Sequence, residues 1–196
     1  DFNTMTISMK IDQATIDTIT ALPSPTIVAI SGFGGSGKST FAKLLGDALD
    51  APVIGVDSFM KDRTIDQYAL WEIMDFDRLT KEVLIPFHAE AKPITYGHFD
   101  WKSNEVAEQR EVSNKGVLII EGVGILRTSL LKYFSYSIWV DCPIEEAIAR
   151  GKKRDRAVHH NPQDELWDGI WRNNDLEYFS TFSPKEVADL IIDNSQ

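Results

Sequence analysis

The chain has 196 residues, a formal net charge of −10 and a 43% share of hydrophobic residues. This size and apolar content suit one domain with a single core. The excess of negative charge argues against nucleic acid or an anionic membrane as the main partner. The single cysteine, Cys142, excludes an internal disulfide and suits a reducing compartment. No apolar run reaches the roughly 18–20 residues that span a membrane. We therefore expect a cytoplasmic protein with a small-molecule partner, and we leave a homo-oligomer open.

Residues 1–25 are expected to form a peripheral N-terminal extension with one helix. Ile11, Thr15, Thr18 and Leu22 recur at roughly helical spacing. The prolines at positions 23 and 25 then interrupt the chain before the first strand. The remaining residues, 26–196, are expected to form a second unit that holds all the motifs described below.

The stretch 26–49 combines an apolar, β-branched strand, a glycine-rich turn and a helix. Gly32, Gly37, Lys38 and Ser39 fit the pattern G-x-x-x-x-G-K-[ST], in which successive backbone N–H groups cradle phosphate oxygens. The lysine of this pattern reaches the β- and γ-phosphates, and the serine hydroxyl can bind Mg²⁺. The chain is therefore expected to bind a nucleoside triphosphate with Mg²⁺. The nucleotide-binding residues that we expect in this P-loop are Gly34, Gly35, Ser36, Gly37, Lys38, Ser39 and Thr40.

Four further apolar segments are predicted to be strands, with helices between them. The strands are expected at 51–56, 116–120, 137–141 and 188–192, and the helices around 77–87, 126–134 and 166–171 and after Pro143. The rest of the stretch 58–115 is polar and aromatic. Strands that are apolar throughout and alternate with helices indicate a parallel sheet that is covered on both faces.

Acidic residues follow three of these strands. Asp57, Glu121 and Asp141 come where strands end, and ligands of such sheets bind outside the carboxyl ends of the strands. Phosphoryl transfer needs Mg²⁺, positive charge around the γ-phosphate and often a carboxylate that takes the proton of the acceptor. Asp57 and Glu121 are best placed for the roles of base and metal ligand. The alternatives are an N-cap for Asp57 and a loop-stabilising acceptor for Glu121. The expected metal ligands are Ser39, Asp57 and Glu121.

The helix after Pro143 ends in a basic cluster. Arg150 and Arg154 are four residues apart and share a helix face, so that with Arg156 they could close over a triphosphate as a lid. The alternative is a solvated helix end, which the helix dipole favours in any case. Among the many aromatic residues of the middle segment most are expected in the core. The candidates for contact with a flat ligand are Tyr96, His98 and Phe99, next to Asp100.

Several motifs together resemble the uridine kinase and phosphoribulokinase-like group of P-loop kinases. They are ISGFGGSGKST, VDSF, DFDRL, HFDW, LIIEGVGIL and DCPIEEAIARGKKRD, and the likeness covers about residues 26–193. The resemblance implies an α/β fold of the P-loop NTPase type, with three layers. Its five-stranded parallel sheet would have the order 2-3-1-4-5, with helices on both faces and a basic lid. Asp57 would be the base, and Asp75 or Asp77 would face the acceptor with Phe99 and Asp100. Uridine kinases of this group carry Y-D-F near the acceptor, where this chain has Phe99-Asp100-Trp101.

The resemblance and the motifs together predict an ATP-dependent kinase that phosphorylates a hydroxyl group. The acceptor that we favour is the 5′-hydroxyl of uridine or cytidine. The alternatives are another small alcohol, such as pantothenate, glycerate or nicotinamide riboside, and a nucleotide-gated regulatory ATPase. The expected catalytic residues are Lys38, Asp57 and Arg154. The expected acceptor-binding residues are Asp57, Asp77, Tyr96, His98, Phe99 and Asp100.

Overall fold

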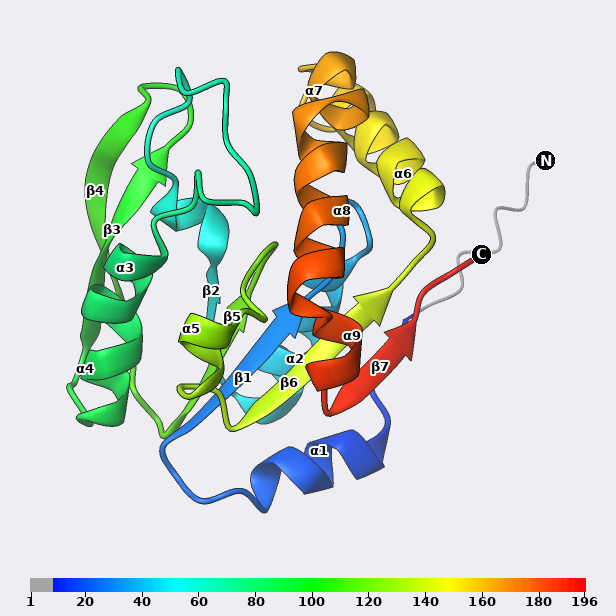
Figure 1. The fold of residues 1–196 in the computed structure, drawn as a ribbon. Coiled ribbons are helices and arrows are strands. Elements are labelled where there is room, and N and C mark those ends of the chain that lie inside the picture. The colour runs from blue at the N-terminus through cyan, green and yellow to red at the C-terminus, as the bar shows by residue number, and fades with distance from the viewer. Residues whose placement is uncertain (1–8) are drawn as a thin grey trace.

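Residues 9–196 are described by a computed structural model, shown as a ribbon in Figure 1. The first eight residues of the expected N-terminal extension lie outside the described residues. The helix of that extension is α1, Gln13–Thr20, with Asp12 as its N-cap. Its Ile19 is 1% exposed and packs in an apolar cluster with residues of the central sheet.

The centre of the fold is a sheet of five parallel strands. These are β1 (Thr26–Ser31), β2 (Val53–Gly55), β5 (Val117–Glu121), β6 (Tyr136–Asp141) and β7 (Leu190–Asp193). They lie in the order β2-β5-β1-β6-β7. Counted along the chain, these five strands have the order 2-3-1-4-5, so the expected sheet is confirmed. β2 is shorter than predicted because the chain turns at Val56 into the 3₁₀ turn η1, Val56–Phe59.

Helices cover both faces of the sheet. Successive side chains of a strand point to opposite faces, and β1 is buried at every position, so each face must pack against other elements. Val28 and Ile30 of β1 pack against α2 (Lys38–Leu49) and against Ile19. Ile27 and Ala29 face a larger cluster on the other side. That second face is covered by α5 (Thr128–Leu131), α8 (Ile170–Phe182) and the segment 76–88. The three expected layers are therefore present.

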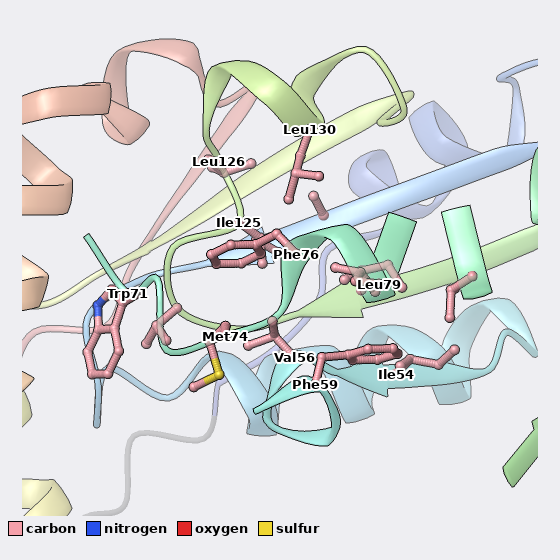
Figure 2. Close-up of a cluster of buried hydrophobic side chains, with 14 of the residues drawn as sticks. Ile54, Val56, Phe59, Trp71, Met74, Phe76, Leu79, Ile125, Leu126 and Leu130 are labelled. Carbon is pink, nitrogen blue, oxygen red and sulfur yellow. The ribbon is translucent and has the colours of Figure 1, made fainter. Parts of the chain in front are cut away.

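The segment 76–88 is one continuous helix with a wider turn in its middle. It runs through α3 (Phe76–Leu79), the π-helical η2 (Thr80–Leu84) and α4 (Ile85–His88). Pro86 has no N–H to donate, and its ring would clash with the carbonyl of Glu82 in a regular α-helix, which accounts for the π turn. Figure 2 shows Phe76 and Leu79 pointing into the buried cluster with Ile125 and Leu130.

An antiparallel hairpin stands apart from the central sheet. It consists of β3 (Ile94–Asp100) and β4 (Glu105–Val112), and no strand was predicted in this part of the sequence. Arg78 fastens the hairpin to η1, because its guanidinium donates to the carbonyls of Gly97 (2.6 Å) and Ser58 (2.7 Å). In Figure 1 the hairpin lies beside α3 and α4, on the opposite side of the molecule from α6.

The remaining helices follow β6. They are α6 (Ile144–Ala157), α7 (Asp164–Asp168) and α9 (Pro184–Val187). Figure 1 shows α6 and α7 next to the end of α8 that lies on the carboxyl side of the strands. This arrangement brings the basic helix α6 over the P-loop.

Candidate active site

The P-loop connects β1 to α2 and turns through two glycines with left-handed backbone. Gly35 has φ 82° and Gly37 has φ 101°, a region that disfavours residues with a Cβ atom. A Cβ on Gly35 would lie 2.0 Å from the carbonyl oxygen of Ala147, so α6 packs directly on the loop. Lys38 begins α2, is 8% exposed, and donates from Nζ to the carbonyl of Phe33 at 3.1 Å. The lysine therefore lies across the curled loop, where phosphate oxygens would sit.

One cavity of about 130 Å³ opens beside this loop. It brings together five residues that the sequence analysis had singled out from separate segments. They are Lys38 and Ser39 of the P-loop, Asp57 of η1, Glu121 of β5 and Arg154 of α6. Asp57 and Glu121 were assigned to the site because each follows a strand. Arg154 was assigned to it because it lies in the basic cluster at the end of the helix after Pro143.

Burial dominates the electrostatics of the two carboxylates. Desolvation raises the pKa of Asp57 above its ordinary value, and the positive charges of Lys38 and Arg154 oppose this rise. Desolvation also raises the pKa of Glu121, where Lys38 opposes the rise and Asp57 adds to it. A carboxylate with a raised pKa is a better proton acceptor near neutral pH. The arrangement thus holds two acids close to one lysine and one arginine in a partly enclosed space.

The oxygen atoms of Ser39 and Glu121 in this cavity are of the kind that bind Mg²⁺. The Ser39 hydroxyl donates to Oε1 of Glu121 at 3.2 Å, so a hydroxyl and a carboxylate oxygen already lie together. Among residues 9–196 no group of three or more His, Cys, Asp or Glu side chains could hold a metal ion by itself. Mg²⁺ is usually held through one or two carboxylates together with substrate phosphates, so a larger cluster is not required.

A second groove runs between the P-loop and α6. Its lining residues are Gly35, Gly37, Lys38, Ser39, Thr40, Arg150, Gly151 and Arg154. Arg150 also pairs with Glu146 and donates to the carbonyl of Asn194 at 2.8 Å. Arg156 instead pairs with Asp164 and lines neither hollow. The structure therefore brings two of the three expected lid arginines to the P-loop.

Four tryptophans line the main cavity, and sequence reasoning did not assign them to it. They are Trp71, Trp101, Trp167 and Trp171. Trp167 donates from Nε1 to Oδ2 of the buried Asp155 at 2.7 Å, and its ring meets that of Trp171 edge-on at 5.0 Å. The helical spacing of Trp167 and Trp171 was visible in the sequence. The resemblance placed the Phe99-Asp100-Trp101 motif near the acceptor, so Trp101 also had a signal in the sequence. Nothing in the sequence indicated that Trp71 would join them.

Most of the residues expected to bind the acceptor lie elsewhere. Phe99 is fully buried, and Tyr96 is 5% exposed and stacked on Phe59. His98 shares a hydrogen bond of 2.9 Å with the hydroxyl of Ser58, and it does not line the cavity. In this structure these three side chains pack within the hairpin or against η1, and their contact with an acceptor stays a prediction.

The expected aspartates also have local roles. Asp100 accepts hydrogen bonds from the amides of Lys102 and Ser103, both at 3.1 Å, in the turn of the hairpin. Asp75 caps α3 by accepting from the amide of Arg78 at 2.9 Å. Asp77 is exposed on α3, and neither Asp75 nor Asp77 lines the cavity. Of the expected acceptor residues, the structure brings Asp57 alone to this cavity.

The other strand-end acid, Asp141, does not line it either. Its carboxylate accepts from Trp139 Nε1 at 3.0 Å and from Lys185 Nζ at 2.6 Å. Ser36 of the P-loop is fully buried and lines neither hollow. Among the described residues, no helix is long and apolar enough to cross a membrane.

Two solved structures that carry kinase names have a similar fold. A possible uridine kinase from Bacillus stearothermophilus superposes with a TM-score of 0.69 at 21% identity, over 92% of this chain and 96% of that one. A candidate fructose transport system kinase from Silicibacter sp. TM1040 superposes with a TM-score of 0.68 at 23% identity, over 93% and 99% of the two chains. No protein-family model matches the chain. The expected resemblance is therefore confirmed at the level of the fold.

Proposed function

We propose that this protein is a kinase that transfers the γ-phosphoryl group of ATP to a hydroxyl group of a small molecule. The observation that carries the proposal is the shared cavity of Lys38, Ser39, Asp57, Glu121 and Arg154. Phosphoryl transfer depends mainly on positioning and on stabilisation of charge, and this cavity offers both signs of charge beside a phosphate-binding loop.

Each side chain has a chemical role in the proposed reaction. The acceptor oxygen bonds to the γ-phosphorus while the bond from that phosphorus to the bridging oxygen of ADP breaks. Asp57 takes the proton of the acceptor hydroxyl, which its raised pKa favours. Lys38 and Arg154 stabilise the negative charge on the transferred group. Ser39 and Glu121 would hold Mg²⁺, which when bound neutralises phosphate charge.

The acceptor that the cavity supports best is a nucleoside, uridine or cytidine, phosphorylated at its 5′-hydroxyl. Four tryptophans offer flat surfaces for a base. A neighbouring hollow of about 220 Å³ shares Met60, Trp101 and Trp171 with the main cavity, and so gives room for the part of the acceptor remote from Asp57. A compact acceptor such as glycerate would leave this second hollow unused. Among the described residues, Arg154 is the one arginine that lines the main cavity, and we assign it to ATP; the second hollow has one arginine, Arg63, in its lining.

The test is a panel of acceptors with purified protein, Mg²⁺ and ATP. Uridine, cytidine, pantothenate, glycerate and nicotinamide riboside are compared by ADP release. We expect turnover with uridine or cytidine. Asp57→Asn should lower kcat by about 10²–10⁴, the usual value of general-base assistance, while ATP still binds. Lys38→Ala should abolish turnover. Asp47→Asn, on the exposed face of α2, is the matched control and should behave as wild type.

The possible outcomes separate the parts of this proposal. Turnover with pantothenate, glycerate or nicotinamide riboside, and none with uridine or cytidine, would keep the kinase and replace the acceptor. ATP hydrolysis that no acceptor stimulates, and that Asp57→Asn leaves unchanged, would indicate a regulatory ATPase instead. An Asp57→Asn protein within a few-fold of wild type on its best acceptor would remove Asp57 from the role of base.

A further inference from the structure

Asp175 of α8 joins two parts of the cavity wall that are far apart in the sequence. The residue is 2% exposed. One carboxylate oxygen, Oδ2, accepts from the backbone amide of Gly34 in the P-loop at 2.8 Å. The other, Oδ1, accepts from the indole Nε1 of Trp71 at 2.9 Å. A single buried side chain therefore connects the phosphate-binding loop to a tryptophan that lines the cavity.

The backbone around Trp71 is strained, and buried polar groups hold it. Leu70 and Trp71 have φ values of 52° and 59°, in the left-handed region that side chains with a Cβ rarely adopt. Asn174, the neighbour of Asp175, accepts from the amide of Trp71 at 2.6 Å. The guanidinium of Arg127 donates to the carbonyl of Leu70. Because such strain persists only where the surroundings impose it, the position of Trp71 depends on α8. Figure 2 shows this ring at the margin of the apolar cluster rather than inside it.

Burial makes the charged form of the Asp175 carboxylate energetically unfavourable. Burial raises its pKa to about 6, and the charge of Lys38 and the bonds from Gly34 and Trp71 oppose the rise. The Trp167 ring also packs close to Gly34, since a Cβ placed on this glycine would lie 3.0 Å from the ring. A displacement of the Gly34 backbone would therefore move the side chain of Asp175, that of Trp167, or both.

We propose that Asp175 is a positioning residue that transmits nucleotide occupancy from the P-loop to Trp71. This inference rests on the proposed function, in which Trp71 forms the acceptor side of the cavity. When phosphates bind to the loop amides, the displacement of Gly34 shifts the Asp175 carboxylate and with it the indole that donates to its other oxygen. The wall that meets the acceptor is then set after the nucleotide binds. By linkage, an acceptor that binds against Trp71 changes nucleotide affinity by the same factor.

The test uses Mg²⁺ with a non-hydrolysable ATP analogue and needs no knowledge of the acceptor. The five indole N–H signals in a ¹H–¹⁵N NMR spectrum are assigned with single Trp→Phe variants, and calorimetry gives the analogue affinity. In wild type we expect the Trp71 indole signal to shift on binding. In Asp175→Asn we expect that shift to fall to less than about a third, with the analogue affinity changed by less than about tenfold. The amide of asparagine cannot accept from both donors, because its nitrogen is itself a donor.

Trp167 supplies the internal control. Its indole bonds to Asp155 rather than to Asp175, and its ring contacts the loop directly, so its response should persist in Asp175→Asn. A full Trp71 shift in Asp175→Asn would overturn the inference. If that variant does not fold, the wild-type spectrum decides, since a Trp71 signal that ignores a bound analogue also overturns the inference. Failure of the analogue to bind wild type would instead overturn the proposed function, and this inference with it.

Discussion

Gly151 gives a sharp test of how α6 packs beside the cavity. It lies inside α6, where replacement of a helical glycine by alanine ordinarily stabilises a protein by about 1 kcal/mol. Here, however, the added Cβ would lie 2.4 Å from two ring carbons of Trp167. The ring cannot simply retreat, because Gly34 of the P-loop lies close to it as well. Overpacking of this kind costs about 1–3 kcal/mol, so we expect Gly151→Ala to destabilise the protein by about 1 kcal/mol.

Thermal unfolding followed by circular dichroism measures this effect. For a chain of this size, about 1 kcal/mol corresponds to a change in Tm of about 2–4 °C. In a Trp167→Phe background the clashing part of the ring is absent, so the same Gly151→Ala change should raise the Tm instead. Ala149→Gly, at an exposed position of α6, isolates helix propensity and should lower the Tm in both backgrounds. If Gly151→Ala shifts the Tm in the same direction in both backgrounds, Trp167 does not pack on α6 as described.

Two further predictions concern charge. Arg154→Ala should lower kcat more than it raises the KM for ATP, the pattern of an interaction that is stronger in the transition state; an effect on KM alone would make Arg154 a ground-state contact. Burial raises the pKa of Asp175 from its ordinary value of 3.8 to about 6 in the folded protein, so between these pH values the folded state holds a proton that the unfolded state has lost. Relative to Asp175→Asn, the free energy of unfolding should therefore fall as pH rises from about 4 to about 6, by about 3 kcal/mol at 1.36 kcal/mol per pKa unit. Urea unfolding of both proteins across this pH range measures the difference, and a constant difference would contradict it.

The central sheet could be predicted from the sequence because its strands are apolar on both faces. Segments such as 116–120 have no polar position that would suggest another structure, and the P-loop motif places the first strand and helix. The carboxyl ends of parallel strands meet at one edge, which is why Asp57 and Glu121 could be assigned to the same site. The sequence could not show which of the strand-end acids would be used locally, as Asp141 is in its bond with Lys185.

The hairpin could not be predicted, for two physical reasons. The residues of β4 are exposed at nearly every position, so the strand lacks the alternation of apolar and polar residues that marks a half-buried strand. In β3 the register shifts between His98 and Phe99, which interrupts the alternation there. Because the sequence does not predict the hairpin, it does not predict the burial of Tyr96 and Phe99 either. The tryptophans of the cavity were missed because two of them lie on loops that only the folded chain brings to the P-loop.

The positions of the tryptophans allow ligand binding to be followed by intrinsic fluorescence. Of the five in the chain, four line the cavity, and the fifth, Trp139, is fully buried in the sheet. Indole emission depends on the polarity and the charges around the ring, and four of the five rings lie where a bound compound would change both. A change in emission maximum on mixing with a compound would report on the cavity and on the P-loop, because Trp139 packs against Phe33 of that loop. Collections of alcohols could therefore be screened against the unlabelled wild-type chain.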